Sequence, residues 1–503
     1  MSGSKICLCL SCSTIKENLL VIEKYRNWID MVELRVDYLT KDERLYIRRF
    51  PELAGLPCIL TIRRRIDGGK FTEGEAARTT LFARGLAFAD QDASKNFAYI
   101  DLEEDFHVPC LQDAALAFGT KIIRSYHNMH HTIDNLAEKM EALRMTGYEI
   151  PKVAVMAHSL SDVTNLYRQV QEVKKQNKGE HIVLAMGPYG LASRVLAQRF
   201  GSLLSYTSPQ ETLFNYYDIG HIDPITLQEV YNYKTIDDAT ALFGITGYPL
   251  TTTGSPKIHN QGYKNHGINA SYLPLKAEKI EEAIEFADVL GISGLSVTVP
   301  HKEKVIDHLQ SITEVTGEIG ACNTIVKKAG EWKGYNTDVY GFSKSLLEFV
   351  GTKNLSRMKV AILGAGGAAR AAAHVVHSLR GKACIFNRTI FKARSLAEYY
   401  NFRWAALDYE SLDVLESYSD LIIQTTSVGL GIREEEMQKE EHDPISFYTF
   451  VGRELVYDMV YSPEKTPLLL RAEKAGCRIE NGKKMLEYQA EAQFSLFTGE
   501  KYE

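Results

Sequence analysis

Short apolar runs recur through the first 210 residues of the chain, and stretches of mixed polarity separate most of them. The runs that predict strands are residues 5–10, 31–36, 58–63, 97–103, 121–127, 152–157, 181–187 and 203–208. Between them, apolar residues recur at three- and four-residue spacing, as in 132–147 and 162–176, which is typical of amphipathic helices. Eight strands alternating with helices favour a (β/α)8 TIM barrel, and an open doubly wound sheet is the alternative that also alternates.

The pattern changes after the eighth run. Residues 211–240 predict a last helix and a connector, and the segment 241–250 begins a new series of strands and helices. Residues 294–302 predict one clear strand with its exit, and a polar break at 351–359 precedes a strand, a glycine turn and a helix. The amphipathic stretch 485–497 predicts a terminal helix. We therefore expect an α/β chain of three folding units, the last two being a substrate-type domain and a dinucleotide-type domain.

Composition and charge narrow the classes of function. The chain is 45% hydrophobic and 24% charged with a formal net charge of -6, so we expect no basic field for nucleic acid. No apolar run reaches the roughly 18–20 residues of a membrane helix, and the N-terminus lacks a signal-peptide pattern. Of the eight cysteines, Cys9 and Cys12 are separated by two residues, but no second pair accompanies them, so we expect reduced thiols and no metal site. These features favour a cytoplasmic protein that acts on small molecules, with no membrane partner, and they leave its oligomeric state open.

One of the predicted strands contains a charged residue. Lys152 lies inside the run I-P-K-V-A-V at 150–155, and a lysine is rarely buried unless another group pairs with it or a reaction uses it. The alternative is a lysine at a strand end whose ammonium group extends to water. His127 ends the preceding predicted strand and is a candidate proton carrier, because the pKa of a histidine lies near neutral pH.

A glycine-rich turn follows the strand that begins the last unit. The turn within V-A-I-L-G-A-G-G-A-A-R, residues 360–370, consists of the small residues Gly364, Ala365, Gly366, Gly367 and Ala368. With Ala369 they complete a G-x-G-x-x-A pattern, in which the first glycine permits the tight turn and the second lets a pyrophosphate approach the helix N-terminus. A tight turn without a nucleotide is the alternative, but the strand before it and the helix after it favour nucleotide binding.

The next strand, within 382–394, indicates which nucleotide binds. A NAD site needs an acidic residue at this strand end for the ribose 2′-hydroxyl, and none is present. The strand instead ends with Asn387, Arg388 and Thr389, and Lys392 follows. A guanidinium group offers a planar fork to phosphate oxygens, so Arg388 favours NADP over NAD, the alternative being a solvated basic helix start.

The middle unit holds a lysine and a carboxylate that could serve a reduction. Lys302 directly follows a predicted strand, and Asp338 lies in G-Y-N-T-D-V-Y-G. A carbonyl that accepts a hydride needs a proton for its developing oxyanion, which a lysine held by a carboxylate can supply. Taken alone, both would be surface residues. However, G-I-T-G-Y-P-L, S-V-T-V-P-H-K, G-A-C-N-T, L-G-A-G-G-A-A-R-A, F-N-R-T and M-L-E-Y-Q-A-E-A-Q-F follow the order seen in shikimate dehydrogenases, so residues 241–503 resemble that family.

This resemblance implies roles for individual residues. It makes Lys302 and Asp338 the catalytic pair, and it assigns Asn387, Arg388, Thr389 and Lys392 to the phosphate of NADP. The residues implied to bind shikimate are Thr253, Ser255, Thr298, Asn323, Asp338, Tyr461 and Gln489. The family's N-P-I-x-H-S-x-S-P reads Y-P-L-T-T-T-G-S-P here, where Thr253 keeps a hydroxyl in place of a serine and Thr252 replaces a histidine.

Residues 5–230 in turn resemble type I 3-dehydroquinate dehydratases, through E-L-R, T-I-R-R with D-G-G, S-Y-H-N-M, I-P-K-V-A-V, G-L-A-S-R and S-P-Q. These enzymes form a Schiff base between a lysine and the substrate ketone. The resemblance implies that Lys152 is this lysine, that His127 carries the proton and that Asp67 orients the histidine. The amine must be neutral to attack, which burial among apolar and cationic neighbours favours. The residues implied to bind substrate are Glu33, Arg35, Arg63, Arg194, Ser208 and Gln210.

Together the two resemblances predict a multifunctional enzyme of the shikimate pathway of aromatic amino-acid synthesis, a lyase joined to an NADP-dependent oxidoreductase. The expected domains are a dehydratase barrel at 1–232, a shikimate-binding α/β domain at 240–350 completed by the helix 482–503, and a Rossmann domain at 351–481. A regulatory protein that binds quinate-like ligands without turnover, and an enzyme with one inactive half, are the alternatives. The presence of both catalytic sets disfavours the regulatory protein, because a ligand sensor needs neither.

Overall fold

The computed structural model of the chain describes residues 3–87, 90–176, 179–212, 220–250, 253–437 and 439–502, so Thr252 lies outside the described residues. Its contacts divide it into two compact units. The first comprises Met1–Leu242 and Tyr263–Ile292, and the second comprises Phe243–Gly262 and Ser293–Glu503. The three-domain division expected from the sequence therefore stays a prediction.

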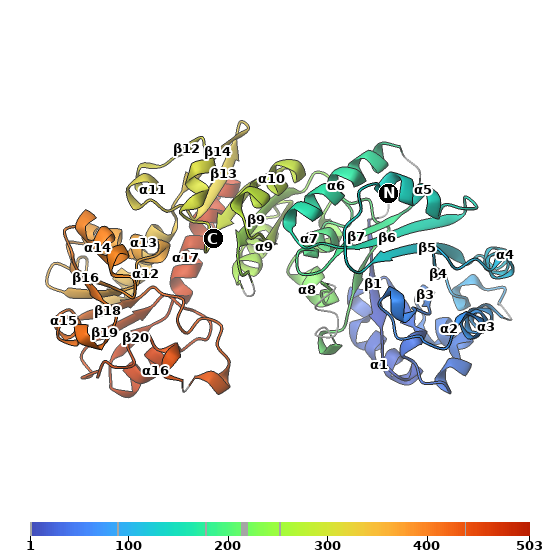
Figure 1. Ribbon diagram of the computed structural model, residues 1–503, viewed down its shortest axis with the longest axis horizontal. Coiled ribbons are helices and arrows are strands. Elements are labelled where there is room, and N and C mark those ends of the chain that lie inside the picture. Colours follow the sequence, from blue (N-terminus) through green and yellow to red (C-terminus); the bar gives the residue numbers. More distant parts are fainter. Residues whose placement is uncertain are drawn as a thin grey trace. The chain divides into compact units, whose positions relative to one another are not determined.

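The first unit contains a nearly closed parallel barrel, drawn from blue to green in Figure 1. Its strands are β1 Lys5–Leu10, β2 Met31–Arg35, β3 Cys58–Thr61, β4 Tyr99–Glu103, β5 Lys121–Asn128, β6 Glu149–Met156, β7 Ile182–Met186 and β8 Leu204–Thr207. The sheet order runs from β7 through β6, β5, β4, β3, β2 and β1 to β8. Between β7 and β8 an isolated bridge joins His181 to Ser202. The barrel, and not the open sheet, is confirmed.

All eight predicted strands form, with small shifts at their ends. The largest shift is in β6, which starts at Glu149 because Glu149 and Ile150 already pair with Ile122 and Ile123 of β5. Side chains alternate between the two faces of a strand, and Ile150 and Ala154 both belong to the apolar cluster inside the barrel. Lys152 lies between them on the same face, so its side chain must enter the barrel.

Helices lie between most of the barrel strands. They are α1 Ile15–Tyr25, α2 Phe50–Ala54, α3 Glu75–Leu86, α4 Pro109–Ala117, α5 Leu136–Leu143, α6 Leu160–Lys175 and α7 Leu191–Val195, and α8 Pro224–Glu229 follows β8. Helix α6 begins at a capping box in which Ser159 accepts from the amide of Asp162 and Asp162 accepts from the amide of Ser159. Its apolar face, which includes Leu166 and Val170, is buried. The helices predicted at 132–147 and 162–176 are thus α5 and α6.

A second sheet has the strand order β10-β9-β11-β13-β14-β12. Its strands are β9 Ala241–Gly247, β10 Ala270–Lys276, β11 Ile292–Val297, β12 Ser311–Ile312, β13 Thr324–Lys328 and β14 Glu331–Tyr335, with helices α9 Ser255–Asn265, α10 Ile280–Leu290, α11 Glu314–Ile319 and α12 Asp338–Val350. Within the first unit, α10 packs on α6, where Arg168 and Glu285 form an ion pair of 2.8 Å. Tyr189 also donates to Glu278 at 3.1 Å. These contacts explain why β10 and α10 cluster with the barrel.

A third sheet, entirely parallel, has the order β17-β16-β15-β18-β19-β20. Its strands are β15 Lys359–Leu363, β16 Lys382–Asn387, β17 Arg403–Ala406, β18 Leu421–Gln424, β19 Leu455–Asp458 and β20 Arg478–Glu480, with helices α13 Gly367–Ser378, α14 Ile390–Tyr399, α15 Leu412–Glu416 and α16 Pro467–Lys474. In chain order this is 3-2-1-4-5-6, the Rossmann arrangement that places a dinucleotide at the end of its first strand, β15. The predicted Rossmann fold is confirmed.

The terminal helix α17, Lys483–Thr498, packs closely against α12. A Cβ atom on Gly341 of α12 would lie 2.7 Å from the carbonyl oxygen of Met485 and 2.8 Å from the amide nitrogen of Gln489. Only glycine therefore allows this approach. The close packing matters because α12 begins with Asp338 and α17 carries Gln489, two of the predicted site residues.

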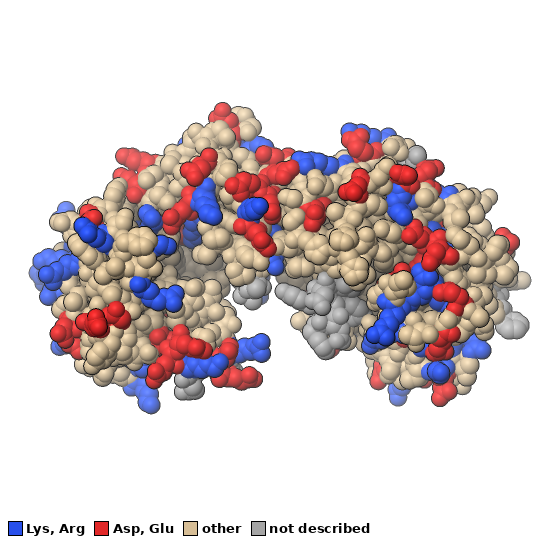
Figure 2. All heavy atoms as spheres, viewed as in Figure 1, with Lys and Arg blue, Asp and Glu red and all other residues tan. Residues whose placement is uncertain are grey.

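Surface charge, thiols, membrane-spanning helices and metal-ligating clusters bear on the remaining expectations for the described residues. Figure 2 shows basic and acidic side chains interspersed on the face that it presents. All eight cysteines are unpaired thiols, and six of them are buried: Cys7, Cys9, Cys58, Cys322, Cys384 and Cys477. Among the described residues, no helix has the length and apolar character to cross a membrane, and no cluster of metal-ligating side chains occurs.

Candidate active sites

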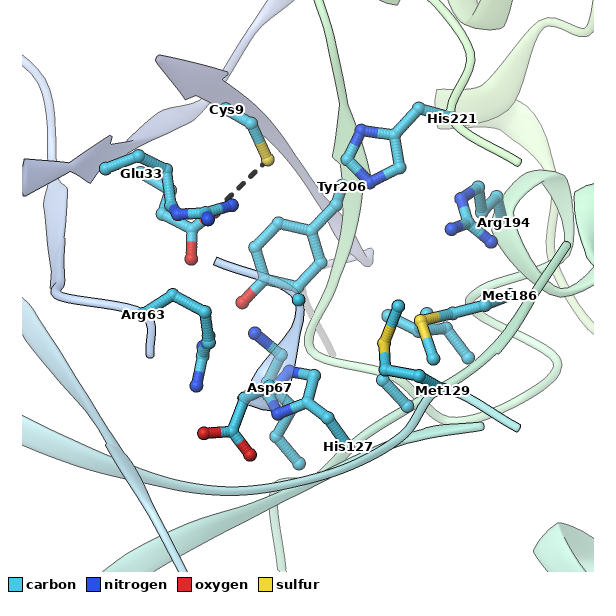
Figure 3. Close-up of a pocket in the computed structure, with 15 residues that line it drawn as sticks. Cys9, Glu33, Arg63, Asp67, His127, Met129, Met186, Arg194, Tyr206 and His221 are labelled. Carbon is cyan, nitrogen blue, oxygen red and sulfur yellow. Dashed lines mark hydrogen bonds between the residues drawn. The ribbon is translucent and has the colours of Figure 1, made fainter. Parts of the chain in front are cut away.

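A pocket opens inside the barrel (Figure 3). It is lined by Cys9, Glu33, Arg35, Arg63, Asp67, Gly68, His127, Met129, Lys152, Ala154, Leu184, Met186, Arg194, Tyr206 and His221. Arg35 and Met186 are the last residues of β2 and β7, so the pocket lies at the carboxyl end of the barrel, where barrel enzymes hold their sites. Lys152 is the fourth of eight residues in β6, and its long side chain reaches this level from inside the strand.

The ammonium group of Lys152 is paired with a buried carboxylate. Its Nζ lies 2.8 Å from Oδ2 of Asp101 on β4, and it also lies 4.3 Å from the ring centre of Tyr206. Asp101 is fully buried, and it accepts from Arg63 at 2.8 Å and from Ser125 at 2.6 Å. Arg63 and Lys152 hold the pKa of Asp101 well below its usual range, although burial opposes them. Asp101 was not predicted, because a single aspartate within a strand carries no distinctive signal.

Further acids and cations balance one another around this pair. Arg63 also donates to Glu103 at 2.7 Å, and Glu103 pairs with the buried Arg78. Glu33 accepts from Thr61 at 2.8 Å. Arg35, the last residue of β2, forms two hydrogen bonds with Asp37, of 2.9 and 2.8 Å.

Arg35 is held by the carboxylate of Asp37. Its Nε and Nη2 atoms donate to the two oxygens of Asp37. Asp37 also accepts from the backbone amides of Arg63 and Lys70. Burial raises the pKa of this carboxyl, but its pKa is lowered overall by Arg35 and these bonds. Arg35 is thus fixed at the pocket wall, as a substrate-binding arginine would need to be.

His127, the last but one residue of β5, lines the same pocket as Lys152. Its pKa is well below the ordinary histidine value, chiefly because burial disfavours the charged ring and then because Arg63 and Lys152 repel it. The buried Nδ1 atom has no hydrogen-bond partner among the described residues. The imidazole is therefore neutral and able to accept a proton.

Asp67 lies near His127 in Figure 3, but its carboxylate pairs with a different residue. Arg64 donates to Asp67 Oδ2 at 2.7 Å and also binds Asp105. No hydrogen bond joins Asp67 to His127 within the described part of the chain. The orienting role that the resemblance implies for Asp67 stays a prediction.

The opposite wall of the pocket carries Arg194 and His221. Arg194 is 1% exposed and donates to the carbonyl of Ala185 at 2.5 Å, and burial lowers its pKa to about 10. Ser208 and Gln210 do not line the pocket. The hydroxyl of Ser208 lies 2.6 Å from Nδ1 of His221. Their direct contacts with substrate stay predictions, and His221 is a pocket residue that no motif indicated.

In the second unit, Lys302 and Asp338 come together as predicted, although they are far apart in sequence. Lys302 Nζ lies 2.6 Å from Asp338 Oδ2, and both side chains are mostly buried. Asn323 donates to the other oxygen of Asp338 at 2.8 Å and to the hydroxyl of Thr337 at 2.9 Å. The amide of Thr337 in turn donates to Asn323 at 2.8 Å. The carboxylate is thereby fixed on both sides.

Helix α17 adds polar side chains to this cluster. Thr337 donates to Gln489 at 3.4 Å, and Gln493 donates to Thr324 at 2.8 Å and accepts from Ser296 at 2.8 Å. Gln493 was not predicted from the sequence, because a glutamine in an amphipathic helix carries no distinctive signal. The cluster shows that α17 supplies part of the site from the far end of the chain.

The remaining predicted shikimate contacts occupy two loops and a helix start. Thr298 follows β11 and donates its amide to the carbonyl of Thr246 at 2.9 Å. Ser255 is the first residue of α9, and its amide donates to Thr253 Oγ1 at 3.3 Å. The side chain of Thr253 also lies close to the hydroxyl of Tyr461, whose pKa burial raises. Thr253 and Tyr461 are therefore brought together, and their contact with substrate stays a prediction.

The glycine turn at the end of β15 has the shape of a phosphate cradle. Gly364 has φ of +115°, and a Cβ atom there would lie 2.5 Å from Thr425 Oγ1, so only glycine fits. A Cβ atom on Gly366 would meet no heavy atom within 4 Å, so the space before the helix α13 is open. On Gly367 it would lie 3.3 Å from Cδ of Lys302. The lysine stem therefore runs beside the nucleotide turn.

The residues after β16 fit a 2′-phosphate. Asn387 ends the strand and donates to the carbonyl of Thr389 at 2.9 Å, which shapes the turn. Arg388 and Lys392 are exposed, and neither has an ion pair among the described residues. Two unpaired cations at this point, without an acidic residue, suit the extra phosphate of NADP. When bound, NADPH would supply a hydride. The residues that would hold NADPH are Gly364 to Ala368, Asn387, Arg388, Thr389 and Lys392.

The two sites define a barrel of the Schiff-base type joined to an NADP-linked dehydrogenase. Comparison with protein-family models supports this. A model described as type I 3-dehydroquinase matches residues 6–238, one described as shikimate dehydrogenase substrate binding domain matches 245–325, and one described as shikimate / quinate 5-dehydrogenase matches 347–449.

Curated relatives cover either half of the chain or nearly all of it. A shikimate dehydrogenase (NADP(+)) from Caldanaerobacter subterraneus is 38% identical over 275 residues, 53% of this chain and 94% of the relative, and one from Halothermothrix orenii is 40% identical over 281 residues, again 53% and 94%. A bifunctional 3-dehydroquinate dehydratase/shikimate dehydrogenase, chloroplastic, from Arabidopsis thaliana is 28% identical over 493 residues, 93% of this chain and 78% of the relative. The chain belongs to the shikimate dehydrogenase family and carries a type I 3-dehydroquinase domain before it.

Replacement of Arg388 tests the cofactor preference. We expect Arg388→Ala to raise the dissociation constant for NADPH by about tenfold or more, because a charge-assisted contact with phosphate is lost, and to leave that for NADH nearly unchanged. Fluorescence titration of each nucleotide measures both constants. Arg394→Ala is the matched control, since Arg394 lies on α14, the helix that follows Arg388, and is paired with Glu398. An equal effect on both nucleotides would contradict the assignment.

Proposed function

We propose that this chain is a bifunctional enzyme of the shikimate pathway. The barrel dehydrates 3-dehydroquinate to 3-dehydroshikimate through a Schiff base on Lys152, and the second unit reduces 3-dehydroshikimate to shikimate with NADPH. The observation that carries the proposal is that each of the two lysines lies next to the groups that its reaction needs. Lys152 lies beside a neutral histidine in a barrel pocket, and Lys302 lies beside a carboxylate and a nucleotide turn.

The dehydration begins with attack of the Lys152 amine on the substrate ketone. The ketone oxygen leaves as water and an iminium forms, which makes the adjacent C–H acidic because its electrons can pass to the positively charged nitrogen. His127, already neutral, accepts that proton. The hydroxyl on the next carbon then departs with this proton as water, and hydrolysis of the iminium releases the product and the free lysine.

The ion pair with Asp101 sets a condition on this sequence. An amine attacks only after it has lost its proton, and Asp101 is a poor acceptor because its neighbours hold its pKa low. His127 is the neighbouring base whose Nδ1 has no partner among the described residues. Asp101 therefore positions Lys152 in the free enzyme, and after the iminium forms its negative charge compensates the new positive nitrogen.

The reduction needs a hydride on one side of the carbonyl and a proton at its oxygen. NADPH, when bound, would supply the hydride. Lys302 is placed by Asp338, and Asn323 fixes Asp338, so the ammonium group has one direction in which to donate its proton. The lysine stem lies beside Gly367, which brings the proton source and the nucleotide turn into the same space. The side chains of Lys302 and Asp338 are largely shielded from water, which strengthens these interactions.

The fusion keeps the producer and the consumer of 3-dehydroshikimate at equal amounts. With the domains at 1–232, 240–350 with 482–503, and 351–481, each reaction would use a separate part of the chain. We place the enzyme in the cytoplasm, where NADPH and small hydroxy acids are available, and we assign it no nucleic-acid partner.

Borohydride trapping tests the first reaction. Reduction of the enzyme in the presence of 3-dehydroquinate should convert the iminium to a stable secondary amine on Lys152, which peptide mass analysis locates. The Lys152→Met variant is the control and should acquire no adduct and lose dehydration. Absence of an adduct on Lys152 in the unmodified enzyme would refute the Schiff-base role.

The pH profile of dehydration tests the state of His127. Its pKa is lowered in the folded protein, so the neutral base persists as the pH falls through the ordinary histidine range near 6.5. We expect kcat/KM for dehydration, followed by the absorbance of the conjugated product, to show no half-loss at pH 6.5 and to decline only at lower pH. A titration with a midpoint at pH 6.5 or above on the acid side would contradict this.

Substitutions at the second site test the reduction separately. We expect Lys302→Ala and Asp338→Asn each to lower kcat for NADP-linked shikimate oxidation by about a hundredfold or more, since each removes the positioned proton carrier. Lys304→Ala, an exposed lysine in the next turn, is the control. Dehydration in the same preparations should remain unchanged. Undiminished turnover in Lys302→Ala would remove Lys302 from this role.

A further inference from the structure

The barrel pocket contains a second histidine that the proposed mechanism does not use. His221 lines the pocket together with Arg194 and Tyr206, on the wall across from His127 (Figure 3). It enters the pocket from the segment that follows β8, and not from a barrel strand. Ile222, the next residue, accepts a hydrogen bond from the amide of Ser208 at 3.1 Å, which ties this segment to the end of β8.

The contact between Ser208 and His221 determines which way the ring faces. Ser208 Oγ lies 2.6 Å from Nδ1 of His221, and Ser208 is fully buried. The serine therefore contacts the side of the histidine ring that faces away from the pocket. With Nδ1 engaged by the serine, the Nε2 edge of the ring is directed toward the pocket (Figure 3).

The same contact decides where the ring carries its proton. A buried hydroxyl that accepted from Nδ1 would need another acceptor for its own hydrogen, and among the described residues the Ser208 hydroxyl has this one partner. The hydroxyl is satisfied if it donates to Nδ1 instead. In that case the neutral ring carries its hydrogen on Nε2 and presents a donor to the pocket.

The charge around His221 supports a neutral donor. Burial, and then the cations Arg194, Arg35 and Lys152, lower the pKa of His221 well below the ordinary value. The largest of these charge effects comes from Arg194, a buried guanidinium that lines the same pocket. An arginine and a neutral N–H donor side by side form a suitable site for a carboxylate, which accepts several hydrogen bonds.

We propose that His221 binds the carboxylate of the barrel's hydroxy-acid substrate through Nε2–H, next to Arg194, and that Ser208 is the positioning residue that fixes the ring in this tautomer. The inference rests on the proposed dehydration. It replaces a direct contact of Ser208 with the substrate by a contact through His221. Lys152 and His127 on the other side of the pocket then act on the ketone end of the same molecule.

Steady-state kinetics of dehydration test the proposal. His221→Ala should raise KM for 3-dehydroquinate by about tenfold or more and change kcat by less than about threefold, because a contact present in both ground and transition states is lost. His221→Gln should recover most of the affinity, since its amide can donate from a similar position, whereas His221→Phe should not. Ser208→Ala should raise KM by a smaller factor than His221→Ala. His131→Ala, an exposed histidine after β5, is the control.

The outcomes separate this inference from the proposed function. Borohydride trapping on Lys152 should persist in every His221 variant at saturating substrate, and its absence in the unmodified enzyme would instead refute the dehydratase assignment. If His221→Ala fails to fold, the comparison of His221→Gln with His221→Phe decides. Equal KM values for these two variants, or a KM of His221→Ala equal to that of the unmodified enzyme, would overturn the carboxylate role.

Discussion

The buried ion pair between Lys152 and Asp101 is the interaction on which the barrel site depends. Asp101 accepts from Lys152, Arg63 and Ser125 at once, so one carboxylate fixes a lysine from β6, an arginine from the segment after β3 and a hydroxyl from β5. Removal of one partner from such a pair costs about 3–5 kcal/mol, because the other charge is left buried and unpaired. The barrel tolerates a lysine in its interior for this reason. The same arrangement keeps the amine where a ketone can meet it.

The second unit also holds a lysine next to a carboxylate, but other elements supply the two residues. Asp338, the carboxylate that we propose to be catalytic, begins a helix and is held by Asn323 from a loop and by Lys302 from another. The terminal helix α17 closes this cluster with two glutamines, and it can do so only because Gly341 has no side chain. In both sites a cation and an acid position each other, and the surrounding hydrogen bonds leave neither free to turn.

Much of the fold followed from periodicity and from short motifs. The eight apolar runs became the eight barrel strands, since a parallel barrel strand must be buried along its whole length. The glycine turn and the basic residues after β16 indicated a dinucleotide and then NADP, because these features act locally. Asp101, Gln493 and His221 escaped prediction because each takes its role from distant neighbours. Asp67 was assigned by resemblance, and in the structure it pairs with Arg64.

The sequence by itself determined the order of strands and helices, the nucleotide turn, and the identity of the two lysines. These depend on spacing along the chain, which folding does not change. Only the tertiary structure decided that Lys152 pairs with Asp101, that Ser208 lies behind His221, and that α17 returns to the reduction site. Such contacts join residues as far apart as Ser296 and Gln493, which are 197 positions apart. Their geometry depends on strand register and helix packing, for which a single sequence holds no local signal.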